Sequence, residues 1–420
     1  MKVAVIGSGI SGLACAHYLS VEHQVWVFEA NKRIGGHTAT MDVQLGTRRY
    51  AIDTGFIVFN DWTYPNFIAL MNELGVSSKP TAMGFSVKDP ASGLEYSGTN
   101  IDTLFAQRRN LLSLPFINMI RDILRFNRHS VADLESGELD DAETLGVYLA
   151  RNGYGEKFTQ QYLAAMGSAI WSADCATILD FPVSFFLRFF KNHGLLSVKD
   201  RPQWRVIEGG SREYLQPLCG RFAERISTGN PVKTVIRKSE GGVTLVMADG
   251  NTHEFDQVVF ATHSDQALAL LQEPSRSERE ILGAIPYQPN DVVLHTDTRL
   301  LPRSEKTWSS WNYTLGASDQ RAVVTYNMNI LQGIDAPETF CVTLNNTAAI
   351  NPHKIIGQFQ YDHPVFSLEG MAAQQRWSEI NGVSDTWYCG AYWHSGFHED
   401  GVVSALRVAN SIGASALAAA

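Results

Sequence analysis

The chain has 420 residues, of which 45% are hydrophobic and 18% are charged, and its formal net charge is −9. This length allows two domains with buried cores, and the composition is typical of a globular protein. The acidic balance argues against general nucleic-acid binding, which depends on basic patches. The sequence shows neither a long apolar run nor an N-terminal signal pattern, so we expect a cytoplasmic protein without a membrane-spanning helix.

The N-terminal segment reads as one β-α-β unit. Residues 2–6 form a continuous apolar run that suits a parallel strand buried on both faces. A glycine-rich stretch at 7–12 and a helical pattern at 13–19 follow, and residues 24–29 predict a second strand. In this context a G-x-G-x-x-G motif indicates a dinucleotide-binding site.

Each glycine of this motif has a separate physical role. Gly7 permits a tight turn, Gly9 lets the backbone approach a pyrophosphate, and Gly12 allows the helix to pack closely on the strand. The pyrophosphate is expected at the helix N-terminus, beside Ser11, where free N–H groups favour negative charge. Glu29 ends the second strand, and its carboxylate is expected to bind the adenosine ribose, which disfavours a 2′-phosphate.

Strand patterns return in the middle and near the end of the chain. Residues 60–204 are helical and aromatic in composition, whereas 226–262, 290–346 and 386–391 hold strand candidates. Because Rossmann-like patterns are dispersed in this way, we expect a discontinuous dinucleotide-binding domain with a second domain inserted as two segments. The expected dinucleotide-binding segments are 1–75, 205–265 and 380–420, and the expected substrate-binding segments are 76–204 and 266–379.

Five cysteines lie far apart and form no C-x-x-C pair: Cys15, Cys175, Cys219, Cys341 and Cys389. This spacing supports neither a disulfide framework nor a zinc site. We therefore expect reduced thiols and no metal.

The segment after the second strand specifies the cofactor further. Residues 29–37, EANKRIGGH, resemble the E-x(3)-R-x-G-G-[R/H/K] segment of the flavin amine oxidase superfamily. That superfamily includes monoamine and polyamine oxidases, protoporphyrinogen oxidase and phytoene desaturase-like enzymes. The resemblance implies an α/β fold with a discontinuous Rossmann-like FAD-binding domain and an inserted α+β substrate domain. No cysteine aligns with the covalent flavin site of monoamine oxidases, so the implied FAD is noncovalent, and His37 is a remote covalent candidate.

Further segments match the same superfamily. Residues 53–56 resemble the D-x-G stretch that lines the flavin, and 209–210 match a glycine pair ahead of the middle Rossmann segment. Residues 388–391 and 401–405 resemble the closing contact, in which a helix N-terminus faces the flavin N1/O2 edge and stabilises the reduced anion. The resemblance implies these cofactor-binding residues: Gly7, Gly9, Ser11, Gly12, Glu29, Arg33, Gly35, Gly36, His37, Thr54, Gly55, Val232, Ala261, Gly390, Gly401 and Val402.

Four strings resemble a narrower bacterial group, often described as predicted NAD/FAD-binding proteins. They are WNYTLGA at 311–317, VTLNN at 342–346, YDHPVFS at 361–367 and GAYWHSGFHEDGV at 390–402. The group is associated with cyclopropane-fatty-acid-synthase-like methyltransferases, and some members are linked to desaturation of methylated fatty acyl chains. The resemblance implies an apolar lipid substrate and a methyltransferase as a candidate partner.

Two departures argue against simple amine oxidation. The acid that usually follows the glycine equivalent to Gly390 is replaced by Ala391, and the strand at 290–295 has no counterpart of the flavin-facing lysine. The sequence also shows no second G-x-G-x-x-G motif for NAD(P)H. The expected cycle is therefore direct: the substrate gives a hydride to flavin N5, and an acceptor reoxidises the flavin.

Histidines and aromatic residues supply the candidate catalytic groups. His295 and Asp297 alternate onto one face of a regular strand, where a His–Asp pair would move a proton, although a structural role is equally open. Two polar runs, 392–394 with Tyr392 and His394 and 397–400 with His398, lie between the closing strand and the last helix, beside the expected flavin ring. The candidates for the wall of the substrate pocket are Phe59, Trp171 and Trp393.

Two stretches suggest contact with lipid. Residues 108–128 place Ile117, Ile120 and Leu124 on one helical face with arginines nearby, and 178–190 are rich in phenylalanine. Ordinary core packing, an acyl-binding tunnel and a membrane-facing mouth all remain open for these stretches. The last would place the protein peripherally on the inner membrane face.

Four functions remain open. The leading one is FAD-dependent dehydrogenation or desaturation of an apolar, fatty-acyl substrate. The others are a peroxide-producing amine oxidase, a noncatalytic FAD-binding partner of a lipid-modifying methyltransferase, and a non-redox enzyme such as an isomerase.

Overall fold

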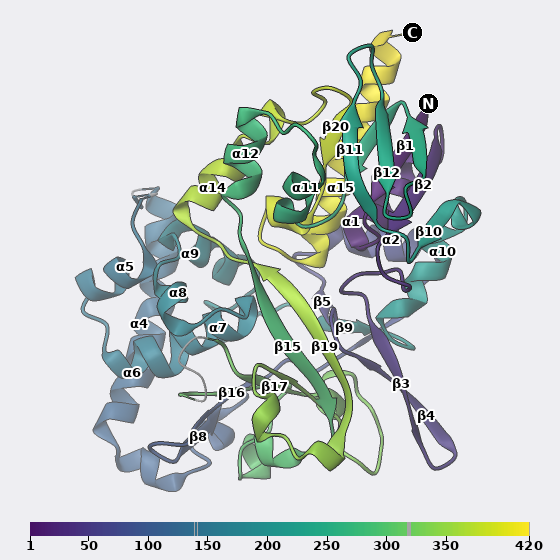
Figure 1. Ribbon diagram of the computed structural model, residues 1–420. Helices are drawn as coiled ribbons and strands as arrows, with labels where there is room; N and C mark the ends of the chain where they lie inside the picture. Colours follow the sequence, from purple (N-terminus) through teal and green to yellow (C-terminus); the bar gives the residue numbers. More distant parts are fainter. Residues whose placement is uncertain (138, 141, 317–320, 420) are drawn as a thin grey trace.

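The computed structural model describes residues 1–137, 139–140, 142–316 and 321–419, so Ala317 of the WNYTLGA string lies outside the described residues. A parallel sheet occupies the end of the molecule at which both chain termini lie, and a mixed sheet with a layer of helices occupies the other end (Figure 1). Each end has its own large hydrophobic core. Along the described chain, no helix is both long and apolar enough to cross a bilayer.

The parallel sheet is assembled from segments far apart in the chain. Its order is β10-β2-β1-β14-β20, and every neighbouring pair is parallel. Val3, Ala4 and Val5 of β1 are fully buried, because both faces of the sheet are covered. The expected discontinuous Rossmann-like sheet is thus confirmed. Its strands are β1 (Lys2–Ile6), β2 (Gln24–Glu29), β10 (Ile226–Thr228), β14 (Gln257–Phe260) and β20 (Thr386–Tyr388).

Two layers cover this sheet. Helices α1 (Ile10–Leu19) and α15 (His398–Ala419) pack against each other. A three-stranded antiparallel sheet packs on the parallel sheet through Phe255, whose ring meets the edges of Trp26 and Phe28. Its strands are β11 (Val232–Arg237), β12 (Val243–Met247) and β13 (Thr252–Phe255).

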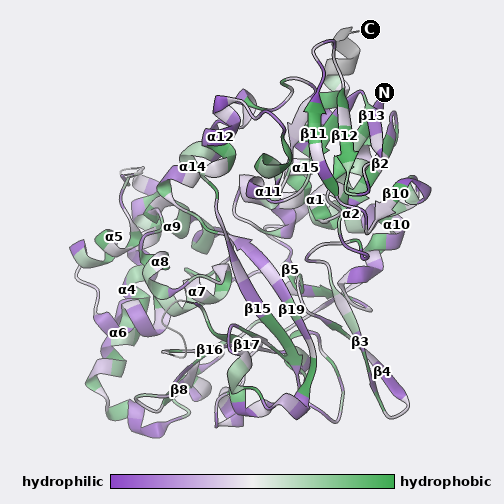
Figure 2. Cartoon of the chain, viewed as in Figure 1, coloured by the Kyte–Doolittle hydropathy of each residue, from purple (hydrophilic) through white to green (hydrophobic). Residues whose placement is uncertain are grey.

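A seven-stranded sheet forms the second end, in the order β19-β15-β18-β17-β16-β7-β8. All of its pairs are antiparallel except β16 with β7. The paired ends of β15 and β19 that point toward the parallel sheet are polar, and their other ends are apolar (Figure 2). The strands are β7 (Phe85–Asp89), β8 (Leu94–Ser97), β15 (Tyr287–His295), β16 (Trp311–Thr314), β17 (Val324–Asn327), β18 (Cys341–Leu344) and β19 (Ile355–Pro364).

Helices pack beside this sheet. The longest, α4, has a proline in its first turn and ends at Gly137 in the left-handed conformation, which are typical start and stop signals. The phenylalanine-rich stretch 178–190 packs mainly in the core, because Phe186 and Phe190 are buried. The helices of this layer are α3 (Ile101–Leu104), α4 (Leu114–Ser136), α5 (Leu145–Arg151), α6 (Glu156–Phe158), α7 (Ala165–Trp171), α8 (Cys175–Leu179) and α9 (Val183–Asn192).

The remaining elements connect the two ends. Three of them, in the order β5-β9-β6, form a small sheet. The expected domain boundary after residue 204 falls inside β9, so the precise domain limits stay a prediction. The connecting strands are β3 (Thr40–Leu45), β4 (Arg48–Asp53), β5 (Phe59–Asn60), β6 (Ser78–Pro80) and β9 (Trp204–Ile207). The connecting helices are α2 (Pro65–Glu73), α10 (Leu215–Cys219), α11 (Ser264–Leu270), α12 (Arg276–Gly283), α13 (Met328–Leu331) and α14 (Leu368–Gln375).

Asp53, at the end of β4, is fully buried and joins three segments of the chain. Its carboxylate accepts hydrogen bonds from the backbone N–H and hydroxyl of Ser211, both at 2.9 Å, and from the Thr40 hydroxyl. The Gln332 side chain, just after α13, donates to the same carboxylate and accepts the backbone N–H of Asp53, both at 2.9 Å. Burial raises the pKa of Asp53 to about 6, against the effect of these hydrogen bonds.

We predict that Asp53→Ala lowers the free energy of unfolding by about 3 kcal/mol, because it leaves several buried donors without an acceptor. Urea denaturation followed by circular dichroism measures this loss. The exposed Asp335, changed to Ala, is the matched control and should alter stability by less than about 0.5 kcal/mol. Equal effects of the two substitutions would show that the Asp53 network is not structural.

Candidate functional site

A continuous cavity of about 1680 Å³ runs between the two cores. It begins at the carboxyl ends of β1 and β2, passes the polar ends of β15 and β19, and reaches α4 and α7. Small-molecule sites usually have volumes of roughly 300–1,000 Å³. The cavity is therefore large enough for a dinucleotide and a second molecule together.

At its first end, the glycine turn leaves room for a large anion. Gly7 has a φ of +104°, and a Cβ added at Gly9 would meet no atom within 4 Å, so open space adjoins the N-terminus of α1. The next loop folds against this turn, because a Cβ at Gly36 would lie 3.1 Å from the Gly9 Cα. Arg33 fixes that loop by donating to the carbonyls of Thr38 (2.6 Å) and Gly36 (2.7 Å). This cradle fits a dinucleotide pyrophosphate.

Glu29 lines the cavity at the end of β2 and is 8% exposed. Its carboxylate accepts the backbone N–H groups of Ser8 (3.0 Å) and Asn31 (2.8 Å), which fix its orientation. The Ser8 hydroxyl and the Asn31 side-chain NH₂ also donate to it, so all of its about four acceptor sites are occupied, and ribose hydroxyls would have to replace these two side-chain donors. The ribose contact itself stays a prediction.

Most of the predicted cofactor residues line the cavity, namely Gly7, Gly9, Ser11, Glu29, Arg33, Gly36, His37, Thr54, Gly55, Val232, Ala261 and Gly390. Four others lie behind its wall: Gly12, Gly35, Gly401 and Val402. A Cβ at Gly12 would be 2.0 Å from the Gly7 carbonyl oxygen, and one at Gly401 would be 2.8 Å from Ile10 Cγ2. These two glycines act through packing, which the sequence predicted for Gly12, and direct cofactor contact by the four is not supported.

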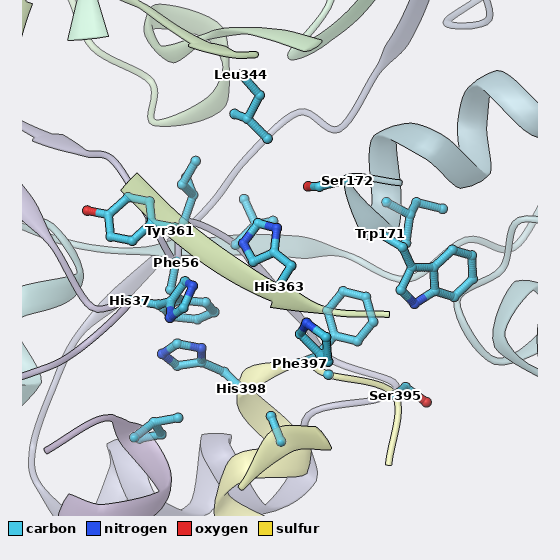
Figure 3. Close-up of a pocket in the computed structure, with 18 of the residues that line it drawn as sticks. His37, Phe56, Trp171, Ser172, Leu344, Tyr361, His363, Ser395, Phe397 and His398 are labelled. Atoms are coloured by element: carbon cyan, nitrogen blue, oxygen red, sulfur yellow. The ribbon is translucent and has the colours of Figure 1, made fainter. Parts of the chain in front are cut away.

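Aromatic and imidazole rings gather where the two cores meet (Figure 3). Between ring centroids, His37 lies 5.1 Å from Tyr361 and 5.4 Å from His363, and His398 stacks on Phe56 at 3.5 Å. Burial lowers the pKa of His37, and it lowers the pKa of His363 to about 4 and that of His398 to about 3. All three rings are therefore neutral at pH 7, with one donor and one acceptor nitrogen each.

Neighbouring strands fix the tautomer of His363. The Asn345 side-chain oxygen accepts the backbone N–H of Asp291 at 3.0 Å, so its NH₂ group donates to the Asn290 side-chain oxygen at 2.8 Å. The Asn290 NH₂ group then lies 3.3 Å from His363 Nδ1, which accepts. The neutral ring therefore carries its proton on Nε2, which is left as a donor for a bound molecule.

The first turn of α15 carries two carboxylates at the edge of this ring cluster. Glu399 accepts the backbone N–H groups of Asn66 (3.0 Å) and Phe67 (2.8 Å) and so joins α15 to α2. Asp400 accepts the backbone N–H of Phe397 at 2.8 Å. Removal of the Asp400 carboxyl from water raises its pKa to about 7, and the nearby charge of Glu399 adds to this effect.

Beyond the rings, the cavity lining is mainly apolar, although Ser172, Arg201 and Gln203 also belong to it. The π-helical turn Thr159–Ala164 leads into α7 and brings Tyr162, Met166 and Ile170 onto the cavity at four-residue spacing. Val292 and Leu344 of the mixed sheet also line this part. Among the described residues, the carboxylates that line the cavity are Glu29, at the dinucleotide end, and Asp362, which alternates along β19 with Tyr361 and His363.

The predicted His295–Asp297 pair is not part of this site, because neither residue lines the cavity. β15 ends at His295, so the alternation assumed for Asp297 does not continue. His295 Nε2 lies 2.7 Å from the Thr343 hydroxyl. The Asp297 carboxylate binds the Arg299 guanidinium, which holds the pKa of Asp297 well below its usual range. The prediction that this pair transfers a proton is wrong, and both residues are structural.

Of the other predicted side chains, some line the cavity and some do not. Trp171 and Tyr392 line the cavity, and neither the Trp171 indole nitrogen nor the Tyr392 hydroxyl has a hydrogen-bond partner. Phe59 instead packs against Tyr64 and Phe67. Trp393 and His394 also lie outside the cavity lining, so their predicted pocket and catalytic roles are not supported.

Sequence reasoning missed Tyr361 and His363 as members of the ring cluster, whereas His398 stood in the polar run expected beside the flavin and Phe56 in the D-x-G stretch. Tyr361 and His363 alternate on one face of β19 within the YDHPVFS string, and this was the available signal. His398 and Phe56 come together only in the folded chain, since 342 positions separate them.

We predict that Asp400→Asn changes the pH dependence of stability. The wild-type carboxyl keeps its proton to about pH 7 when folded but only to about pH 3.8 when unfolded, so stability falls as the pH rises between these values. The full loss is on the order of 3 kcal/mol for this partly exposed side chain. The melting temperature of the variant, relative to wild type, should therefore rise from pH 4 to 7.5 in thermal melts. If the difference in melting temperature between variant and wild type does not vary with pH, the raised pKa of Asp400 is contradicted.

Known proteins resemble this chain in sequence and in fold. The chain is 24% identical over 299 residues to the 15-cis-phytoene desaturase of Arabidopsis thaliana, covering 65% of this chain and 50% of that protein. The chain thus spans about half the length of that relative. Its fold is similar to that of cyclohexylamine oxidase from Brevibacterium oxydans, with a TM-score of 0.71, 18% identity and 99% of both chains covered. It is also similar to a CLA-producing fatty acid isomerase from P. acnes, with a TM-score of 0.68, 15% identity, and coverage of 98% of this chain and 97% of the other.

The model of the family described as flavin containing amine oxidoreductase matches residues 10–328, most of the chain. The open cradle at Gly9, the oriented Glu29 carboxylate and the length of the cavity fit FAD. No cysteine is among the described residues that line the cavity. The protein therefore belongs to the flavin containing amine oxidoreductase family, and its cavity fits the FAD cofactor of that family.

Proposed function

We propose that the protein dehydrogenates an apolar, fatty-acyl substrate. The observation that carries this proposal is the apolar end of the cavity, which lies next to the ring cluster and offers no carboxylate among its described lining residues. Burial of each methylene contributes about 0.8 kcal/mol, so such a wall favours an alkyl chain. A protonated amine would have to enter the same space without a counter-ion, which is costly.

The chain supplies binding, orientation and proton handling. Bound FAD supplies a hydride acceptor at N5. Tyr162, Met166 and Leu344 hold an alkyl chain and exclude water from the ring cluster. Desaturation removes a hydride from one carbon and a proton from its neighbour, and the electrons of the second C–H bond form the double bond. His37 is the candidate proton acceptor, because its ring is neutral and its Nε2 has no hydrogen-bond partner.

The comparisons are compatible with lipid chemistry on this fold, since one similar protein is named a phytoene desaturase and another a fatty acid isomerase. The similarity to cyclohexylamine oxidase and the family assignment keep amine oxidation as the second candidate. The isomerase similarity also keeps a reaction without net electron transfer as an outcome to be tested.

We predict that methylated or unsaturated acyl lipids, added anaerobically, bleach the flavin band near roughly 450 nm, whereas cyclohexylamine and putrescine do not. Bleaching by the amines alone would replace this proposal with amine oxidation. Conversion of an acyl lipid to a positional isomer, with no net bleaching, would indicate isomerisation. A flavin that no candidate reduces, together with co-purification of a methyltransferase, would indicate a noncatalytic partner.

We predict that Leu344→Asp raises the KM for an acyl substrate at least about tenfold, since it introduces an unpaired charge into the apolar wall. Leu344→Met, which keeps the wall apolar, is the matched control and should leave KM within about twofold. Flavin absorbance shows whether both variants retain the cofactor. An unchanged KM in Leu344→Asp would place the substrate elsewhere.

Two glycine variants separate cofactor binding from folding. We predict that Gly9→Ala lowers FAD affinity at least about tenfold with little loss of stability, because its Cβ would enter the open space expected to hold the pyrophosphate. Gly12→Ala should destabilise the whole protein, since its Cβ would lie 2.0 Å from a backbone oxygen. Flavin titration and thermal melts of both variants test this contrast, and similar behaviour of the two would contradict it.

A further inference from the structure

The apolar end of the cavity opens between two lips that expose large hydrophobic side chains. We define the first lip as residues 101–128, which comprise α3, a short 3₁₀ helix (Arg108–Leu112) and α4 as far as Arg128. The second lip is the 194–202 loop together with Trp62, since a Cβ at Gly194 would lie 3.3 Å from the Trp62 ring. Ile101, Leu124 and Val198 line the cavity, yet they are 79%, 48% and 66% exposed. Residues with both properties mark the mouth.

Exposed hydrophobic side chains are concentrated at this mouth. Among the described residues, twelve large hydrophobic side chains are exposed, and seven of them belong to the two lips. Leu112 and Leu114, at 90% and 74% exposure, are more exposed than Leu111 beside them at 52%. Soluble proteins rarely gather exposed apolar side chains in this way unless the patch binds something. Trp62, 49% exposed, adds an aromatic ring of the kind found at membrane interfaces.

The charge of the first lip is opposite to that of the whole protein. Residues 101–128 contain five arginines and two aspartates, whereas the chain carries a net charge of −9. Arg108 and Arg125 pair with the two aspartates. Within the described chain, the remaining three, Arg109, Arg121 and Arg128, have no carboxylate within salt-bridge distance and are exposed. Apolar side chains interspersed with free arginines match an anionic lipid surface.

We propose that the two lips dock on an anionic lipid bilayer and that the acyl chain enters the cavity directly from it. On α4, Ile120, Ile123 and Leu124 face the cavity, while Phe116 and Phe126 face the core. The helix thus presents a continuous apolar path from the surface to the interior. Entry from the bilayer rests on the proposed acyl substrate, whereas docking itself depends only on the lips.

Sedimentation of the FAD-loaded protein with vesicles tests the docking. The wild type should bind vesicles of phosphatidylglycerol and phosphatidylcholine, bind pure phosphatidylcholine at least about tenfold more weakly, and lose affinity as salt rises. Leu112→Glu combined with Leu114→Glu, and Arg121→Glu combined with Arg128→Glu, should each weaken binding at least about tenfold. Both sets change exposed side chains, so folding and flavin content should persist. Val21→Glu and Val383→Glu, exposed at 65% and 48% away from the mouth, are the matched controls and should bind normally.

The proposal is overturned if wild-type protein does not bind the anionic vesicles at low salt, or if the lip variants bind as well as the controls. It is also overturned if sedimentation velocity shows a dimer that the Leu112→Glu and Leu114→Glu changes dissociate, because a second copy would then cover the lips. Flavin bleaching by a detergent-solubilised acyl substrate is measured in the same variants. Normal bleaching without vesicle binding would reject docking while leaving the acyl dehydrogenase proposal intact.

Discussion

The buried carboxylate of Asp53 is the constraint on which the shape of the cavity depends. It binds Ser211, beside the middle segment of the Rossmann-like domain, and Gln332, beside the mixed sheet. The next two residues, Thr54 and Gly55, form part of the cavity wall. A side chain without hydrogen-bonding groups could not hold these segments at one point, and the two cores would lose their fixed separation. The space between them is thus set by this polar contact together with Phe397, which packs against both cores.

The groups that line the cavity change in three stages from the dinucleotide end to the far end. Backbone N–H groups and one oriented carboxylate line the dinucleotide end, neutral imidazoles and aromatic rings line the middle, and alkyl side chains line the far end. The middle stage depends on burial, which keeps His37, His363 and His398 uncharged. Charged histidines there would draw water toward the apolar end. The hydropathy gradient along β15 and β19 supports the same order of environments.

How much the sequence predicted depends on how local each signal is. The glycine motif, Glu29 and the first β-α-β unit are set by short-range spacing, and the structure has the expected strand, turn and helix. The His295–Asp297 prediction failed because strand alternation was extended past the strand end, where Arg299 captures the carboxylate. His363 escaped notice because its tautomer is set by Asn290, 73 positions earlier, through the register of β15 with β19. Such partners depend on pairing between distant strands, which periodicity in one sequence does not reveal.

The dispersed order of the parallel sheet has a consequence for synthesis in the cell. β1 and β2 gain their neighbours β14 and β10 only after about 200 or more further residues, and β20 and α15 follow later still. Pairings of such long sequence separation form slowly, and they cannot form on the ribosome until the partner strands emerge. In a nascent chain, the glycine turn therefore lacks the opposite wall of the cavity until the segment around His398 has been synthesised. Capture of FAD is accordingly expected only after α15 has been synthesised, and a chain that stops before it would expose the apolar core of the parallel sheet to chaperones and proteases.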